Sequence, residues 1–196
     1  IYAHAWGGSQ DPCLLQCKDG TLICTSYLWA FLRPDGMARL KQPYAEAGGA
    51  VFFGGYLVRS TDGGRNWEGP IVPPAVPTEK NFNPFGKTVA AYNRGALCET
   101  RDGRILWAVA SSDAGSLTNT SVHLMVSRDK GLSWEYGGLI ARDDRISFNE
   151  TSIYETPGGD VVAFMRSERN GDQGCIARST DGGRTFGPWE SMGFRG

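Results

Sequence analysis

The sequence predicts an all-β protein built from three successive four-stranded antiparallel units, and two repeated patterns carry this prediction. The first pattern is an octet of the form Ser-x-Asp-x-Gly-x-x-Trp/Phe, which occurs at residues 60–67, 127–134 and 179–186. The second is a hairpin signal that precedes each octet, in which Asp-Gly or Gly-Gly joins two apolar runs. Helical periodicity, which would place apolar residues three or four positions apart, is absent from the sequence.

The octets are expected to be tight turns held by their own side chains. In each octet the Asp carboxylate can accept hydrogen bonds from backbone N–H groups two or three residues further on, and glycine supplies a positive φ. The closing aromatic residue then enters the core as the next strand begins. The three aspartates, Asp62, Asp129 and Asp181, are therefore predicted to be structural.

The hairpins set the order of strands in each unit. Their paired runs are residues 13–17 with 21–24, 96–99 with 105–109, and 151–155 with 161–165. Each unit then reads strand, tight turn, strand, variable loop, strand, octet, strand, which places the units at about 9–73, 92–141 and 148–192. Residues 35–49 can hold a turn or two of helix, but their glycine and proline content favours a long loop.

The octet resembles the Asp-box, or BNR repeat, of sialidases (neuraminidases) and related β-propellers, where it joins the third and fourth strands of a blade. This resemblance implies a β-propeller of four-stranded antiparallel blades, with three blades in the 196 residues. Three blades are about half of a six-bladed, sialidase-like ring, and an open stack would leave exposed sheet edges. We therefore expect residues 1–196 to be one partial propeller domain cut from a longer protein.

Composition excludes several classes of function. A formal net charge of −1 gives no electrostatic reason to expect nucleic acid as a partner. No apolar run approaches the roughly 20 residues that a membrane-spanning helix needs. The five cysteines are expected to be small buried side chains rather than disulfides, and with two histidines in the chain we predict no metal site and no cofactor.

Strand parity distinguishes the two faces of the units. The tight turns and octets share one face, and the loops of variable length, where binding residues tend to lie, share the other. Candidate site residues are therefore those that begin a first strand or end a second strand. They are Gln10, Asp11, Trp29 and Arg33 in the first unit, Asn93, Arg94, Ser112 and Asp113 in the second, and Asn149, Glu150, Arg166, Glu168 and Arg169 in the third.

The third hairpin carries the strongest candidates, because Glu150 opens it and Arg166 closes it. A three-residue turn centred on Gly158 would make the two residues direct cross-strand partners, and a two-residue turn would move them one place apart. From the residues alone, a salt bridge that caps the strand pair is the simpler alternative. Asp11 has a similar alternative, as a cap at the entry of the first strand.

This hairpin resembles the one that carries two active-site groups in sialidases. There the Glu pairs with a tyrosine nucleophile, and the Arg is one of three that bind the sialate carboxylate. A guanidinium suits that task because it binds carboxylates bidentately and stays charged. The resemblance implies that Glu150 is catalytic and that Arg166 and Asn149 bind substrate, with Asp11 and Arg94 as further substrate-binding candidates.

The chain also departs from the sialidase pattern. Sialidases open their first blade with an Arg followed by Ile-Pro, whereas this chain has Gln10, Asp11 and Pro12 there. The nucleophile, the general acid and the third Arg of the sialidase pattern are not placed in the sequence. By itself the chain is therefore expected to be inactive.

The resemblance implies an exo-glycosidase that hydrolyses terminal sialic acid, or a related acidic sugar, from glycoconjugates. The alternative is a non-catalytic Asp-box propeller that binds glycan or protein. The expected partner is a sialylated or otherwise acidic glycan. A secreted or extracytoplasmic location is implied by the resemblance alone.

Overall fold

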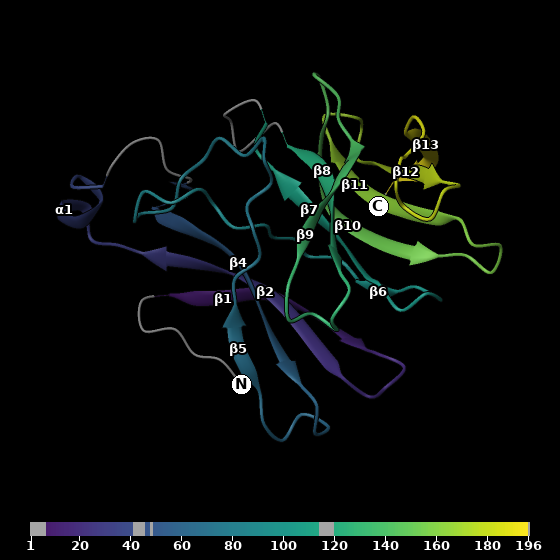
Figure 1. The fold of residues 1–196 in the computed structure, drawn as a ribbon. Helices are drawn as coiled ribbons and strands as arrows, with labels where there is room; N and C mark the ends of the chain where they lie inside the picture. Colours follow the sequence, from purple (N-terminus) through teal and green to yellow (C-terminus); the bar gives the residue numbers. More distant parts are fainter. Residues whose placement is uncertain (1–6, 41–45, 48, 114–119, 196) are drawn as a thin grey trace.

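The computed structural model describes residues 7–40, 46–47, 49–113 and 120–195. They form three antiparallel β-sheets that follow one another along the chain and lie next to one another (Figure 1). We call these sheets blades 1, 2 and 3. The described residues contain one helix, α1 (Pro34–Met37), a single turn that overlaps the start of the loop predicted for residues 35–49. None of their helices is long and apolar enough to cross a membrane.

The strands of each blade pair in chain order, with one exception. Blade 1 contains β1 (Gly8–Gln16), β2 (Leu22–Phe31), β3 (Glu46–Ala47), β4 (Ala50–Ser60) and β5 (Glu68–Ile71). Here β3 and β5 both pair with β4, one at each end of that strand. Blade 2 contains β6 (Cys98–Glu99), β7 (Ile105–Ser111), β8 (Ser121–Ser127) and β9 (Glu135–Ala141). Blade 3 contains β10 (Ser147–Glu155), β11 (Val161–Glu168), β12 (Gln173–Ser179) and β13 (Glu190–Arg195).

The hydrophobic cores lie between the blades, and β7 shows how the sequence builds them. Trp107 points into a core shared with Ile23 and Leu57 of blade 1. Its neighbour Leu106 points into a second core, shared with Phe148 of blade 3. Successive strand residues face opposite sides of a sheet, so a strand with a core on each side reads as a continuous apolar run. The five cysteines are all free thiols, three of them buried.

The three octets form the predicted tight turns with one set of contacts. Asp62, Asp129 and Asp181 each accept a hydrogen bond from the backbone N–H four residues further on, at 2.9 Å. The sequence had suggested two or three residues. In the third octet Asp181 also accepts the N–H of Arg184, three residues further on, at 2.9 Å, as predicted. Two consecutive residues in each octet have positive φ, which folds the following backbone back toward the aspartate; in the second octet these are Lys130 (φ 58) and Gly131 (φ 86).

The serine that opens each octet completes the turn. Ser127 Oγ donates to Asp129 Oδ1 at 2.9 Å and accepts the N–H of Gly131 at 2.8 Å. Trp134 closes the octet by donating its indole N–H to the carbonyl oxygen of Gly131 at 3.2 Å. These local contacts fix the turn face of the blades and leave the opposite ends of the strands available for a site.

A repeated carboxylate also joins each blade to the one before it on the turn face. Glu99 accepts the backbone N–H of Lys18 at 2.6 Å and pairs with the ammonium of Lys130. Glu155 accepts the backbone N–H of Arg101 at 2.8 Å. Glu99 and Glu155 have the same place in their hairpins, so the same type of hydrogen bond stabilises both blade junctions.

Candidate functional site

Three residues from equivalent positions in the blades converge at the ends of the strands away from the octets. Asp11, Arg94 and Glu150 each lie nine residues before the glycine of positive φ in their tight turn. Those glycines are Gly20, Gly103 and Gly159. A shared offset from the same turn places the three side chains at the same height on neighbouring blades, where they can meet.

The charges of this cluster alternate. Arg94 bridges two carboxylates, with Nε 3.1 Å from Asp11 Oδ2 and Nη1 3.1 Å from Glu150 Oε1. Arg166 Nη1 lies 3.6 Å from Glu150 Oε1 and 2.9 Å from Glu168 Oε1. The cluster therefore holds three carboxylates and two guanidiniums in one chain of contacts that crosses all three blades.

A β-bulge brings Glu150 next to Arg166. Near the turn, the paired residues of β10 and β11 are arranged symmetrically about Gly158. This is the first of the two predicted registers. The ladder shifts further along, so that Asn149 and Glu150 together oppose Arg166. Blade 1 has a comparable bulge in β1 that contains Asp11, whose φ is 45. Bulges of this kind redirect side chains at the rims of sheets, which is what both acidic residues need to reach Arg94.

Two asparagines hold the charged residues in place. Asn93 Oδ1 accepts the backbone N–H of Arg94 at 2.7 Å, and Asn149 Oδ1 accepts that of Glu150 at 2.7 Å. The Asn149 side chain also donates to Glu168 Oε1 at 2.9 Å and accepts from Arg166 at 3.2 Å. Each asparagine thus fixes the backbone of the charged residue that follows it.

Aromatic side chains form the wall beneath the cluster. Phe52 lies at the centre of this wall. The centroid of its ring is 4.5 Å from the ring centroid of Tyr92, 4.7 Å from that of Trp29 and 5.8 Å from that of Tyr27. The guanidinium of Arg94 lies 5.7 Å from the ring centre of Tyr27, within the range of a cation–π contact. Tyr27 also donates its hydroxyl to Asp11 Oδ2 at 2.5 Å.

Neither tyrosine of this wall makes a hydrogen bond to Glu150, whose carboxylate pairs with Arg94 and Arg166. Burial, and then the hydrogen bond to Asp11, raise the pKa of Tyr27 above its ordinary value. Burial also raises the pKa of Tyr92. Both hydroxyls are protonated at neutral pH, as an ordinary phenol is, and a neighbouring base would have to take the proton before either could attack.

The charged cluster and the aromatic wall enclose a cavity of about 360 Å³, which we call the cluster cavity. Arg94, Glu150, Arg166 and Glu168 line one part of it, and the four aromatic residues line another. The side chains of Arg94 and Arg166 are 47% and 50% exposed, so a bound molecule could reach both guanidiniums. An apolar wall with a few convergent polar groups is typical of small-molecule sites.

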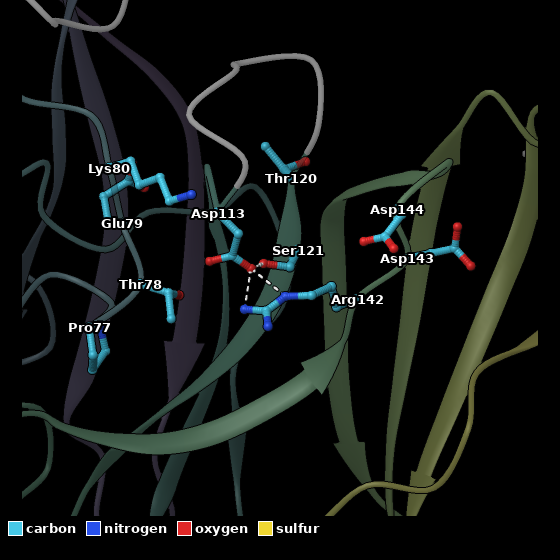
Figure 2. A pocket seen from close by; sticks show the side chains of 10 residues that line it. All are labelled: Pro77, Thr78, Glu79, Lys80, Asp113, Thr120, Ser121, Arg142, Asp143 and Asp144. Atoms are coloured by element: carbon cyan, nitrogen blue, oxygen red, sulfur yellow. Dashed lines mark hydrogen bonds and ion pairs between the residues drawn. The ribbon is translucent and has the colours of Figure 1, made fainter.

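A second cavity of about 510 Å³ lies beside the first, and Thr120 lines both (Figure 2). At its centre Asp113 Oδ2 accepts two hydrogen bonds from Arg142, at 2.8 and 2.6 Å, and another from Ser121. Burial raises the pKa of Asp113, but these donors outweigh it and lower the pKa below its ordinary value. Burial lowers the pKa of the adjacent His123, which is neutral at physiological pH. This polar cavity lacks an aromatic wall among the described residues that line it.

The structure brings most of the sequence-predicted candidates together. Asp11, Arg94, Asn149, Glu150 and Arg166 form or support the charged cluster, and Trp29, Asn93 and Glu168 line the same cavity. Others lie elsewhere. Arg33 is exposed and pairs with Asp35, Asp113 belongs to the second cavity, and the buried Ser112 donates its N–H to Glu79 there.

Sequence reasoning missed the aromatic wall apart from Trp29. Tyr27 precedes Trp29 by two positions on one strand, and that alternation was an available signal. Phe52 and Tyr92 gave no such signal, because they reach the wall from a different strand and from the link between blades 1 and 2.

Comparison with known proteins places this fold among propellers. A family model described as a BNR repeat-like domain matches residues 9–195. A protein of unknown function from Dyadobacter fermentans is 61% identical, with a TM-score of 0.96, over 100% of this chain and 54% of its own. A Hadza microbial sialidase is 21% identical, with a TM-score of 0.64, over 92% of this chain and 33% of its own.

A second glycosidase shows a similar fold. The GH93 α-L-arabinofuranosidase of Fusarium graminearum is 17% identical, with a TM-score of 0.59, over 93% of this chain and 48% of its own. At these identities the two enzymes share the fold with this chain, and that likeness confirms the predicted sialidase-like propeller. The chain spans 54% of the Dyadobacter protein, 33% of the sialidase and 48% of the arabinofuranosidase.

Proposed function

The chain belongs to the family of BNR repeat-like domains, and we propose that the protein is a glycoside hydrolase that removes a terminal sugar from a glycan. The reaction would take place at the cluster of Arg94, Glu150 and Arg166. The observation that carries the proposal is the convergence of these three side chains, from two blades, on one cavity with an aromatic wall. A fold alone does not assign an activity, so the proposal rests on this geometry.

The sugar that we propose is sialic acid or a related acidic sugar. Arg166 makes its contacts with Glu168, Asn149 and Glu150 through Nη1 alone, so its Nε and Nη2 groups have no hydrogen-bond partner among the described residues. Such a pair of N–H groups can bind a carboxylate bidentately. A substrate carboxylate at this edge of Arg166 would leave Glu150 facing the reacting end of the sugar.

Glu150 would act as a base in this scheme. It would accept a proton from the attacking group, and Arg94 and Arg166 would hold its carboxylate in position. We do not assign the attacking group to Tyr27 or Tyr92, since neither makes a hydrogen bond to Glu150. A secreted location, which the family resemblance implies, would bring the protein to extracellular glycans.

The second candidate function is glycan binding without catalysis. It is favoured by the contacts of Glu150, which pairs with Arg94 and Arg166 and makes no hydrogen bond to Tyr27 or Tyr92, so the described cavity holds no base paired with a nucleophile. Fluorogenic sialosides and arabinofuranosides, assayed with the whole protein, separate the two functions. Turnover that is lost in Glu150→Gln supports the hydrolase, and sugar binding without any turnover supports the second candidate.

A further inference from the structure

Three aromatic residues follow one face of β2 and lead out of the cluster cavity. Tyr27, Trp29 and Phe31 occupy alternate positions, so their side chains share one face of the strand. Their exposure rises along this line. Tyr27 is 2% exposed, Trp29 is half-buried and Phe31 is 79% exposed. Over four residues the strand advances about 13 Å, so the aromatic line is longer than a single sugar ring needs.

A further cavity follows this line beyond Trp29. It has a volume of about 350 Å³ and is lined by Gly8, Ser9, Gln10, Trp29, Phe31 and Arg94, among others. Trp29 and Arg94 also line the cluster cavity, so the two spaces are adjacent. We call this space the Phe31 cavity.

From this adjacency and the line of aromatic residues we infer that the Phe31 cavity is a binding site for the second sugar ring of the glycan, with Trp29 between the two rings. This inference rests on the proposed function, because the first ring would occupy the cluster cavity. The sugar ring at the second site would present its apolar C–H face to Phe31 and Trp29. Amphipathic ligands of this kind match a site that is aromatic on one side and polar on the other.

The lining also indicates the charge of the second sugar. Among the described residues that line the Phe31 cavity, Arg94 alone is charged, and both Asp11 and Glu150 already pair with it. The Gln10 side chain makes no hydrogen bond to another described residue and can turn to a sugar hydroxyl. A cavity with its single cation neutralised and an uncharged amide at its rim suits a neutral sugar better than an acidic one.

The position of Phe31 makes it a clean probe. Its side chain is exposed, and its backbone pairs with Ala50 at the end of the β2–β4 ladder. A smaller side chain there leaves the buried wall of Tyr27 and Phe52 intact. Phe85 is a matched control, because it is 61% exposed, aromatic and outside both cavities.

The test compares one-ring and two-ring sugars by isothermal titration calorimetry, in the Glu150→Gln form so that no probe is cleaved. The probes are N-acetylneuraminic acid against the disaccharide N-acetylneuraminyl-α2,3-galactose, and L-arabinose against arabinobiose. We expect the two-ring member of the matching pair to bind about tenfold more tightly, the order of magnitude of one aromatic contact. Phe31→Ser should abolish this preference and leave the affinity for the one-ring sugar unchanged, whereas Phe85→Ser should retain both.

Two outcomes overturn the inference in different ways. If a one-ring sugar binds but the two-ring sugar binds no better, or if Phe31→Ser keeps the preference, the second-sugar site is wrong and the proposed function stands. If no probe binds to the protein, the proposed function is overturned and the second-sugar site with it.

Discussion

Asn93 fastens blade 2 to blade 3 through the backbone of Thr151. Its Nδ2 donates to the Thr151 carbonyl oxygen at 2.8 Å, and its Oδ1 accepts the Thr151 N–H at 3.4 Å. Thr151 directly follows Glu150, and Asn93 directly precedes Arg94. The hydrogen bonds between Asn93 and Thr151 therefore lie next to the Arg94–Glu150 ion pair in both chain segments. The geometry of the ion pair depends on this junction between the blades.

We expect Asn93→Ala to destabilise the fold and to disturb the pair. The side chain is buried and also donates to the Ala108 carbonyl oxygen at 2.6 Å, so its removal leaves several buried backbone groups without partners. The expected cost is about 1–3 kcal/mol of unfolding free energy, measured by denaturant unfolding. An unchanged midpoint would show that water replaces the amide without loss and that Asn93 does not position Arg94.

Glu150 and Arg166 should affect different steps of the reaction. Glu150→Gln keeps the shape and removes the base, so in the whole protein turnover should fall by on the order of a hundredfold, with a smaller change in inhibitor affinity. Arg166→Lys keeps the charge but loses the pair of N–H groups that binds a carboxylate bidentately, so a sialate-like inhibitor should bind roughly 1–3 kcal/mol more weakly.

Thermal stability of the same two variants provides the control. A salt bridge that only caps the strand ends would lower the melting temperature of both variants and spare the activity of each folded molecule. Full activity in Glu150→Gln would remove Glu150 from the reaction and favour the binding propeller.

Turnover should be absent from the 196-residue chain by itself. The described cavity offers Tyr27 and Tyr92, and neither makes a hydrogen bond to Glu150, so neither is positioned as the nucleophile that Glu150 would assist. The measurement is release of fluorophore from a sialoside by the purified chain. Release above the level of a Glu150→Gln control would place the complete catalytic machinery within these residues.

Glu99→Ala should lower the free energy of unfolding by more than the loss of an exposed ion pair does. Glu99 has a side chain that is 6% exposed and joins the backbone of Lys18 to the ammonium of Lys130. Its loss should cost about 1.5–3 kcal/mol, because a largely buried carboxylate and its charge-assisted hydrogen bonds disappear. Glu135→Ala is the matched control. Its pair with Arg128 is mostly exposed, so we expect a change below about 1 kcal/mol in the same unfolding experiment.

The octet aspartates should make the fold sensitive to acid. Burial raises the pKa of Asp129, but hydrogen bonds from Ser133 and Ser127 more than offset it, and the pKa falls below the ordinary value of 3.8. A group whose pKa is lower in the folded state stabilises the fold above its unfolded pKa, and this contribution is lost as pH falls below about 3.8 toward the folded value.

Asp129→Asn tests this origin, because it keeps the acceptor oxygen and removes the charge. At neutral pH we expect the variant to lose about 0.5–2 kcal/mol, the range of a side chain that caps exposed amides. The difference from the parent protein should shrink as the pH is lowered through the acid range. A difference that stays constant with pH would mean that the charge of Asp129 does not stabilise the turn.

The sequence by itself determined the blades and the face on which candidates should be sought. Octets and hairpins are local signals, because a positive-φ glycine, a turn aspartate and an alternating apolar run act within a few residues of one another. The three octets fold as the pattern predicts. The offset of nine residues between Asp11, Arg94 or Glu150 and the turn glycine can be read from the sequence.

Only the tertiary structure decided which of those candidates meet. Arg94 reaches Asp11 and Glu150 because neighbouring blades pack at a fixed height, and the bulge opposite Arg166 turns Glu150 toward it. The aromatic wall needs Phe52 and Tyr92, which arrive from separate segments and carry no local sign of their meeting. Contacts between blades depend on the packing of distant segments, and no pattern of a few residues encodes that packing.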